Sequence, residues 1–301
     1  MTRTVAAVDC GTNSIRLLVA DVDRMVELAR VMTIVRLGEG VDQTGRLSDA
    51  ALDRVKVACQ SYREIIDKRG VTAVRFVATS AARDASNSVE FVADVSRIMG
   101  VEPEILTGEE EAALTFAGAV RGQMLEKPAL VFDIGGGSTE FVRGIERPTG
   151  FASVDMGCVR FTERYVDSDP VSDVEASAIR SEVGRELDAV ERSVPLAGAR
   201  TLVGCAGTVT TVAALALGLT EYDSARIHGA RISAGDVAAV SEDLLAMTSH
   251  QRADLPVMHA GRADVIPAGC LILSAIVERS GASELVASEH DILDGIAWSL
   301  A

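Results

Sequence analysis

The stretch Val5-Ala-Ala-Val-Asp-Cys-Gly-Thr-Asn-Ser14 places a Gly/Thr/Asn/Ser turn after a short apolar run, and a second apolar run, Leu17–Ala20, follows it. Two such runs around turn-forming residues are typical of a β-hairpin. The pattern returns in Leu130-Val-Phe-Asp-Ile-Gly-Gly-Gly-Ser138, where Asp133 takes the place of Asp9 at an offset of 133 − 9 = 124 residues. A repeat at that distance predicts two similar halves.

Strand and helix patterns alternate along the rest of the chain. Asp49–Lys68 has helical periodicity, Val71–Thr79 has the pattern of a strand, and Asn87–Met99 is an amphipathic helix pattern. The alternation continues after the second hairpin and predicts an α/β fold. We expect a first domain over residues 1–122, with a C-terminal helix at 290–301 packed on it, and a second domain over residues 123–289.

The composition excludes several classes of function. Lys and Arg number 29 against 44 Asp and Glu, a net charge of −15, which argues against a broad nucleic-acid or anionic-membrane surface. No window holds about 18 uninterrupted apolar residues, so we expect a soluble, cytoplasmic protein that makes no membrane contact. The five cysteines lack the spacing of a zinc site or a disulfide framework. None of the three lysines lies in a glycine-rich turn, which excludes a Walker-type phosphate lysine.

Both hairpin turns suit an anionic ligand. The spacing Asp-x-Gly-x-x-Ser puts backbone N–H groups and small hydroxyls around a tight turn, where no bulky side chain blocks an anion. Two copies, each after an apolar strand and an aspartate, can hold adjacent phosphates. The alternative is a pair of ordinary hairpins with turn-preferring residues.

Five stretches form an ordered set along the chain: Asp9–Ser14, Thr79–Arg83, Thr107–Ala112, Asp133–Glu140 and Gly207–Thr211. In order and spacing they resemble the exopolyphosphatase and guanosine pentaphosphate phosphatase (Ppx/GppA) family. The resemblance covers essentially the whole chain, in the short two-domain form of the family. It implies a duplicated actin-like (ribonuclease H-like) α/β fold with the active site in an interdomain cleft, and Mg²⁺-dependent release of terminal phosphate.

The resemblance assigns catalysis to Glu111, which matches the family's catalytic glutamate. The neighbouring acids have local explanations, because Glu110 completes a capping box with Thr107 and Glu109 is a first-turn acid favoured by the helix dipole. From the residues alone, Glu111 fits that dipole role equally well.

The resemblance assigns the metal to acids of the two turns. Asp133 and Glu140 match the family's metal and water-positioning carboxylates, and Mg²⁺ needs only one or two carboxylates beside phosphates. Asp9 is the corresponding acid of the first turn, with an alternative role in ending a strand and fixing the turn. The expected cofactor is Mg²⁺, with Mn²⁺ as a substitute.

The resemblance also assigns phosphate contacts. Arg83 follows a strand in a turn of small residues, where a guanidinium can bind a phosphate bidentately. Gly207 and Thr208 form a third phosphate-contacting turn, or simply a helix start. Arg262 and Asp264 resemble a family pair, which a structural ion pair explains equally well. The remaining contacts expected in the cradle are Asn13, Ser14, Gly135, Gly136, Gly137 and Ser138.

We therefore expect an exopolyphosphatase that acts on inorganic polyphosphate. A short-chain preference is expected because the further helical domain of larger family members is missing from this sequence. The alternatives are a pppGpp 5′-phosphohydrolase, an actin-fold kinase or ATPase, and a non-catalytic polyphosphate or (p)ppGpp sensor. A homodimer is compatible with the family. Leu293 stands where many relatives have an arginine, which leaves the role of that arginine open.

Overall fold

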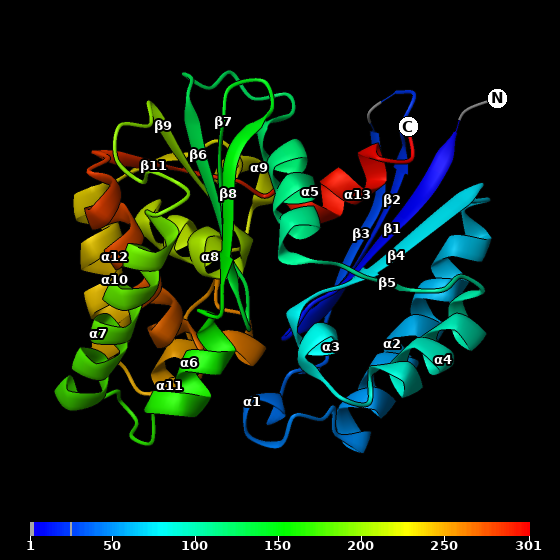
Figure 1. The fold of residues 1–301 in the computed structure, drawn as a ribbon, viewed down its shortest axis with the longest axis horizontal. Helices are drawn as coiled ribbons and strands as arrows, with labels where there is room; N and C mark the ends of the chain where they lie inside the picture. The colour runs from blue at the N-terminus through cyan, green and yellow to red at the C-terminus, as the bar shows by residue number, and fades with distance from the viewer. Residues whose placement is uncertain (1–2, 25) are drawn as a thin grey trace. The chain divides into compact units, whose positions relative to one another are not determined.

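The computed structural model describes residues 3–24 and 26–301, which divide into two compact units (Figure 1). The first unit reaches Gly118 and also includes Ile292–Ala301, whereas the second comprises Ala119–Asp291. Each unit is a mixed β-sheet with helices packed on it. No helix in the described part of the chain is long and apolar enough to cross a membrane.

The first unit contains five strands and six helices among its described residues. They are β1 (Thr4–Cys10), β2 (Ser14–Asp21), β3 (Val26–Ile34), α1 (Val41–Thr44), α2 (Asp49–Lys68), β4 (Ala73–Ala78), α3 (Ser80–Asp84), α4 (Ser88–Met99), β5 (Glu104–Ile105), α5 (Gly108–Val120) and α13 (Ile292–Trp298). The last residues of α5 lie in the second unit.

The second unit has a six-stranded sheet and a larger set of helices. They are β6 (Ala129–Ile134), β7 (Thr139–Gly144), β8 (Pro148–Val154), α6 (Cys158–Tyr165), α7 (Asp173–Val190), β9 (Thr201–Cys205), α8 (Ala206–Ala216), α9 (Ser224–Ile227), β10 (Arg231–Ser233), α10 (Ala234–Ala246), α11 (Ser249–Ala253), the 3₁₀ helix η1 (Ala260–Arg262), α12 (Ile266–Ser280) and β11 (Glu284–Ala287).

The two sheets have the same topology, as the repeat predicts. The strand order is β3-β2-β1-β4-β5 in the first sheet, and β8-β7-β6-β9-β11 with β10 added at the edge in the second. The first three strands of each series are antiparallel, and the next two run parallel to β1 or β6. This confirms the predicted α/β, actin-like duplicated fold.

The shared topology explains where polar residues gather. The parallel strands β1, β4 and β5 end at one edge of the first sheet, and β6, β9 and β11 end at the corresponding edge of the second. Both glycine turns follow such strand ends, as do the starts of α3, α5 and α8. Carboxyl-end edges of this kind are the usual ligand-binding positions in α/β sheets.

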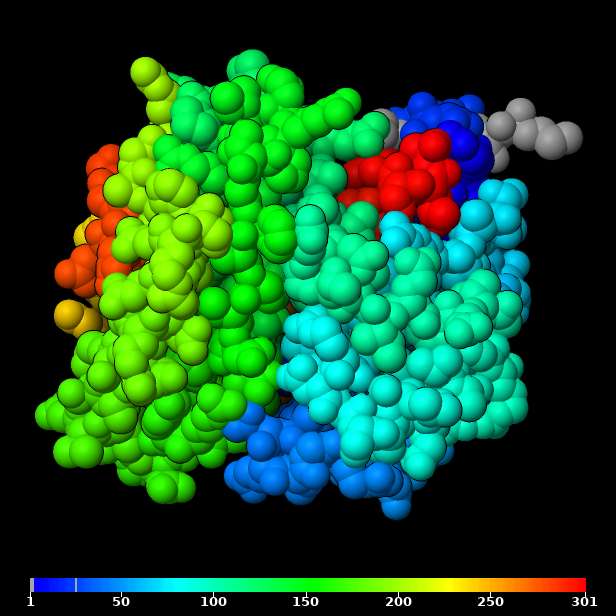
Figure 2. All heavy atoms as spheres, in the orientation of Figure 1, coloured from blue at the N-terminus to red at the C-terminus, as the bar shows by residue number. Residues whose placement is uncertain are grey.

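Alternation along β1 divides the first unit into two apolar layers. Ala6 and Val8 face the core formed with α2 and α4, whereas Val5 and Ala7 face the opposite side, where α13 packs. Figure 2 shows the C-terminal residues, in red, against the blue atoms of the first strands. Asp9 has the parity of Val5 and Ala7, so its carboxylate lies on the α13 face of the sheet.

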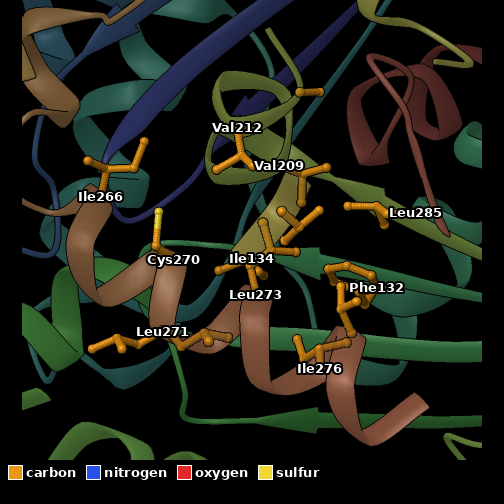
Figure 3. Packing of buried hydrophobic residues seen from close by; sticks show 14 of the residues in the cluster. Phe132, Ile134, Val209, Val212, Ile266, Cys270, Leu271, Leu273, Ile276 and Leu285 are labelled. Carbon is orange, nitrogen blue, oxygen red and sulfur yellow. The ribbon is translucent and has the colours of Figure 1, made fainter. Parts of the chain in front are cut away.

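The second unit has one large core on the opposite face of its sheet from the acids of β6 and β7. Phe132 and Ile134 of β6 pack against Leu273 and Ile276 of α12 (Figure 3). Because side chains alternate along a strand, Asp133 lies on the face away from this core.

Several elements of the structure have no counterpart in the sequence-based expectations, among them β3, β8, α6 and the short elements α1, α3, β5, α9, α11 and η1. Strands β3 and β8 lie at sheet edges, where the chain is only partly buried and the apolar pattern is weak. Strand β8 also contains Pro148 and Gly150, which are disfavoured in strands. Helix α6 is short, at eight residues. The five cysteines are buried and free.

Candidate phosphate and metal site

The first turn (residues 11–14) joins β1 to β2 and closes with a hydrogen bond from Gly11 N–H to the Ser14 carbonyl at 2.9 Å. Asp9 and Arg16 are directly opposite each other across the two strands. The Arg16 guanidinium donates to Asp9 Oδ2 from Nη2 at 2.5 Å and from Nε at 3.0 Å. Asp9 is only 4% exposed, so this buried carboxylate is compensated by a guanidinium of the neighbouring strand.

The second turn (residues 135–138) joins β6 to β7 with the same closure, Gly135 N–H to the Ser138 carbonyl at 3.0 Å. Here the opposed residues are Asp133 and Glu140, two acids that are 7% and 2% exposed. Directly opposed residues of antiparallel strands lie on one face of the sheet, with Cβ atoms about 5 Å apart. Two carboxylates in that arrangement repel each other unless a positive charge or a proton compensates them.

The acid pair fits a hard divalent cation. Mg²⁺ takes oxygen ligands and is commonly held by one or two carboxylates together with waters and substrate phosphates. Glu140 Oε1 accepts a hydrogen bond from Ser153 Oγ at 2.8 Å, which orients that carboxylate from β8. No cluster of three or more His, Cys, Asp or Glu side chains suited to a metal occurs among residues 3–24 and 26–301. Asp133 and Glu140 offer the one or two carboxylates that a Mg²⁺ site commonly takes from the protein, the other ligands being waters and phosphate oxygens.

Two predicted site residues of the first unit are in contact. Arg83, at the end of α3, places Nη1 3.3 Å from Glu111 Oε2 and donates to the Leu106 carbonyl at 2.9 Å. Glu111 is 8% exposed and lies in the first turn of α5. The guanidinium therefore orients the Glu111 carboxylate.

The neighbouring Glu110 has the capping role expected from the sequence. Its side chain accepts hydrogen bonds from the Thr107 backbone N–H and hydroxyl, both at 2.9 Å, and Thr107 Oγ1 accepts from Glu110 N–H at 3.3 Å. The backbone hydrogen bond and the hydroxyl together lower the pKa of Glu110 below its ordinary value. Glu110 therefore caps α5, whereas Glu111 points elsewhere.

The first turn is also tied to α3. Thr12 Oγ1 and Ser80 Oγ are 2.9 Å apart, and the Thr79 N–H donates to the Cys10 carbonyl at 3.2 Å. This links the turn that contains Asn13 and Ser14 to the helix that ends near Arg83. The first unit thus joins its phosphate turn and its Arg83–Glu111 pair through α3.

The third predicted phosphate turn, Gly207–Thr208, is packed from both sides. A Cβ added to Gly207 would lie 2.2 Å from Arg262 Cζ, so the guanidinium of Arg262 rests on this glycine. Thr208 is 4% exposed, and a Cβ on Gly269 of α12 would lie 2.4 Å from Thr208 Oγ1. The Thr208 side chain is therefore part of the α8–α12 packing. The preceding Ala206 has a positive φ of 67°, an uncommon value for a residue with a Cβ.

Burial also limits what two other side chains, those of Leu293 and Cys158, can contribute to a site. Leu293 is fully buried in the apolar layer between α13 and the first sheet, so it takes no part in a polar site. Burial raises the pKa of the Cys158 thiol to about 11, which keeps it neutral beside the second turn. A thiolate nucleophile is therefore not available at this position at neutral pH.

Three residues that surround the turns escaped the sequence analysis: Arg16, Ser153 and Arg160. Arg16 could have been found from the sequence, because the offset of 124 that relates Asp9 to Asp133 also aligns Arg16 with Glu140 (16 + 124 = 140). Ser153 lies on the unpredicted strand β8, and Arg160 lies on the unpredicted helix α6.

Comparison with known proteins identifies the family. The model of the Ppx/GppA phosphatase family matches residues 18–300. The chain belongs to the Ppx/GppA phosphatase family. A Mycobacterium tuberculosis protein described as exopolyphosphatase 2 is 46% identical over 314 residues, covering 99% of this chain and 98% of the relative.

Solved structures of the Ppx/GppA family share the architecture. The crystal structure of an exopolyphosphatase-like protein superposes with a TM-score of 0.94 at 41% identity and covers 97% of both chains. The Aquifex aeolicus family member superposes with a TM-score of 0.85 at 29% identity, covering 100% of this chain and 98% of its own. The Ppx/GppA fold therefore extends over the whole of this chain.

Proposed function

We propose that this Ppx/GppA phosphatase is a Mg²⁺-dependent exopolyphosphatase that releases terminal phosphate from inorganic polyphosphate. The observation that carries the proposal is the buried acid pair Asp133–Glu140 beside a glycine turn, a donor set suited to a cation that binds together with phosphate. The similarity to a protein described as exopolyphosphatase 2 supports the choice of substrate.

In the proposed reaction Glu111 is the general base. It accepts a proton from water as the water oxygen bonds to the terminal phosphorus, and the bridging P–O bond breaks to leave a chain shortened by one phosphate. Arg83 orients Glu111 and contributes positive charge toward the transferring phosphoryl group. When bound at Asp133 and Glu140, Mg²⁺ would neutralise charge on the phosphate oxygens.

The remaining predicted residues supply binding in this proposal. Asn13 and Ser14 of the first turn, and Gly135, Gly136, Gly137 and Ser138 of the second, offer backbone N–H groups and hydroxyls to phosphate oxygens. Gly207 and Thr208 contribute backbone N–H groups at the start of α8, since the Thr208 side chain is packed on α12. Asp9, which is bonded to Arg16, supports the first turn rather than holding the metal.

Glu111→Gln tests the role of the base. The substitution should lower phosphate release by about 10²–10⁴-fold, the usual contribution of a general base, while the Kd for tripolyphosphate changes little. Glu109→Gln is the matched control, because Glu109 is an exposed acid of the same first turn. Near-normal turnover in Glu111→Gln would contradict the assignment.

Substrate choice is tested by measuring phosphate release from tripolyphosphate, longer polyphosphates, pppGpp and ATP, each with Mg²⁺, with Mn²⁺ and with EDTA. Polyphosphate should be the preferred substrate, and EDTA should abolish release. Faster release from pppGpp would favour a pppGpp phosphohydrolase, and comparable release from ATP a generic nucleotidase. Tight binding of polyphosphate without release would favour a sensor. The same assay tests the expected short-chain preference.

A further inference from the structure

The start of α6 is built onto the second turn. The backbone N–H of Cys158 donates to the Gly135 carbonyl at 3.0 Å, and the N–H groups of Val159 and Arg160 donate to the Gly136 carbonyl at 2.9 and 3.0 Å. A Cβ on the preceding Gly157 would lie 2.3 Å from the Gly136 oxygen. The chain therefore packs backbone on backbone here, and two carbonyls of the turn point toward α6.

A side chain holds the third carbonyl of this turn. Arg160 Nε donates to the Gly137 oxygen at 2.7 Å, and Arg160 Nη2 lies 3.8 Å from the exposed Asp155 carboxylate. The Arg160 side chain is only 12% exposed, so this charge-assisted hydrogen bond is largely shielded from water. All three carbonyls from Gly135 to Gly137 are therefore fixed by the Gly157–Arg160 segment.

The orientation of these carbonyls determines where the amide protons point. In a trans peptide the C=O of one residue and the N–H of the next point in opposite directions. The N–H groups of Gly136, Gly137 and Ser138 consequently point away from α6. Successive N–H groups turned to one side form an anion-binding concavity.

The first turn holds the corresponding carbonyl in another way. The Asn13 carbonyl, which aligns with that of Gly137 at the offset of 124, accepts backbone N–H groups from Val35 at 3.0 Å and Arg36 at 2.8 Å. In the second turn the side chain of Arg160 takes their place. This contact is therefore one that a substitution can remove without altering the backbone.

We propose that Arg160 is a positioning residue for phosphate binding: by holding the Gly137 carbonyl it keeps the Gly137–Ser138 peptide oriented so that the Ser138 N–H is presented to phosphate. The inference rests on the proposed function for the identity of the ligand. Its physical basis is the freedom of a glycine-rich backbone, since Gly137 has no Cβ to prevent that peptide from rotating. Loss of the guanidinium should weaken phosphate binding by the Ser138 N–H most and by the Gly136 N–H least. The Gly136 N–H shares a peptide group with the Gly135 carbonyl, which Cys158 still holds.

The test is a titration of the full-length protein with tripolyphosphate in the presence of Mg²⁺, followed by amide ¹H–¹⁵N NMR and by calorimetry. In the wild type, the Gly136, Gly137 and Ser138 amides should shift on binding. In Arg160→Ala the Ser138 response should be lost and the Gly136 response retained, with Kd and KM raised about 10- to 100-fold, as for other residues that orient a ligand-binding group. Added methylguanidinium should partly restore binding, which a purely structural role would not allow.

Arg180→Ala is the matched control, because Arg180 is an exposed arginine of the same unit on α7. It should bind tripolyphosphate as the wild type does. Arg160→Lys keeps the charge but lacks the planar fork and should bind several-fold more weakly. If Arg160→Ala does not fold, Arg160→Lys decides the outcome through the same Ser138 response.

The outcomes separate this inference from the proposed function. A Kd within twofold of the wild type in Arg160→Ala, with an intact Ser138 response, would overturn the role of Arg160. A wild type whose turn amides do not respond to tripolyphosphate would overturn it as well. Turn amides that respond in a wild type that releases no phosphate would overturn the proposed function and leave the role of Arg160 standing.

Discussion

The two glycine turns have the same backbone but opposite electrostatics. Each closes with a Gly N–H to Ser carbonyl hydrogen bond, each follows a buried strand, and each is preceded by a buried aspartate. Across the strands, however, Asp9 is opposite Arg16 whereas Asp133 is opposite Glu140. The first turn carries its own compensating cation, and the second places two acids together.

This difference separates the roles of the two halves. Arg16 compensates the charge of Asp9, so in the proposed function the first turn contributes to phosphate binding and the metal is bound by the second turn. In the proposed function, the half with the Asp133–Glu140 pair is the one in which metal binding and phosphate binding depend on each other, because two opposed carboxylates favour a nearby cation. The difference between the two turns arises at one position of the repeat, which is Arg16 in the first half and Glu140 in the second.

The largest effect is expected when the second turn is given the electrostatics of the first. Glu140→Arg should pair with Asp133 as Arg16 pairs with Asp9, and it should exclude Mg²⁺. Loss of metal assistance worth several kcal/mol corresponds to a fall in phosphate release on the order of 10³-fold. The measurement is the initial rate of phosphate release across a Mg²⁺ titration.

The control for this substitution is Glu146→Arg, which reverses the charge of an exposed acid in the β7–β8 connection. It should leave the rate and its Mg²⁺ dependence unchanged, because exposed ion pairs contribute little. An active, Mg²⁺-dependent Glu140→Arg enzyme would show that the acid pair is not the metal site.

A smaller effect is expected from removing the compensating cation of the first turn. Arg16→Ala leaves the buried Asp9 carboxylate without its guanidinium, and breaking a buried pair from one side is strongly destabilising. Because the Arg16 side chain is 21% exposed, water offsets part of the loss, and we expect the free energy of unfolding to fall by about 2–4 kcal/mol. Urea denaturation followed by circular dichroism measures it.

The double variant Asp9→Asn with Arg16→Met removes both charges. It should recover most of the stability lost in Arg16→Ala, since the cost arises from an uncompensated charge rather than from a lost attraction. Equal instability of the two variants would mean that the cost arises from packing around Arg16 instead.

The smallest effects are expected at the glycines that support each turn. A Cβ at Gly157 would meet the Gly136 carbonyl carbon at 2.4 Å, and one at Gly38 would meet Thr12 Cγ2 at 2.2 Å. A backbone carbonyl cannot turn aside, whereas Thr12 can rotate about χ1 at the cost of its hydrogen bond to Ser80, so Gly157→Ala should be the more costly, about 2–3 kcal/mol against about 1–2 kcal/mol for Gly38→Ala. Thermal and urea unfolding compare the two.

A second substitution sharpens this contrast. Adding Thr12→Ser to Gly38→Ala removes the clashing methyl and should restore stability, whereas the Gly157 contact involves backbone and has no such remedy. Equal costs for the two alanine variants would show that the second turn can shift as readily as the first.

The sequence was a good guide to the elements that carry strong patterns. The repeat around Asp9 and Asp133 predicted the duplicated sheets, and the capping box at Thr107 predicted the start of α5. Edge strands such as β3 leave weak patterns because they are only partly buried.

The contacts within the candidate site were harder to predict from the sequence than the helices and strands, for a physical reason. The contacts of Arg160 with Gly137 and of Arg262 with Gly207 join residues 23 and 55 positions apart, and no local pattern encodes such contacts. The Arg83–Glu111 contact was likewise not visible from spacing. Cross-strand partners are the exception, because the repeat and the hairpin register together place Arg16 opposite Asp9.

The position of α13 bears on the order in which the protein can fold during synthesis. The second unit is one continuous segment, so all of its core is available once Asp291 has left the ribosome. The first unit is synthesised earlier, yet one face of its sheet is covered by Ile292, Leu293 and Ile296 of α13. Arg30 Nη2 of β3 also donates a hydrogen bond to Asp294 Oδ1 of α13 at 2.7 Å. The half of the molecule that is made first therefore completes its packing last.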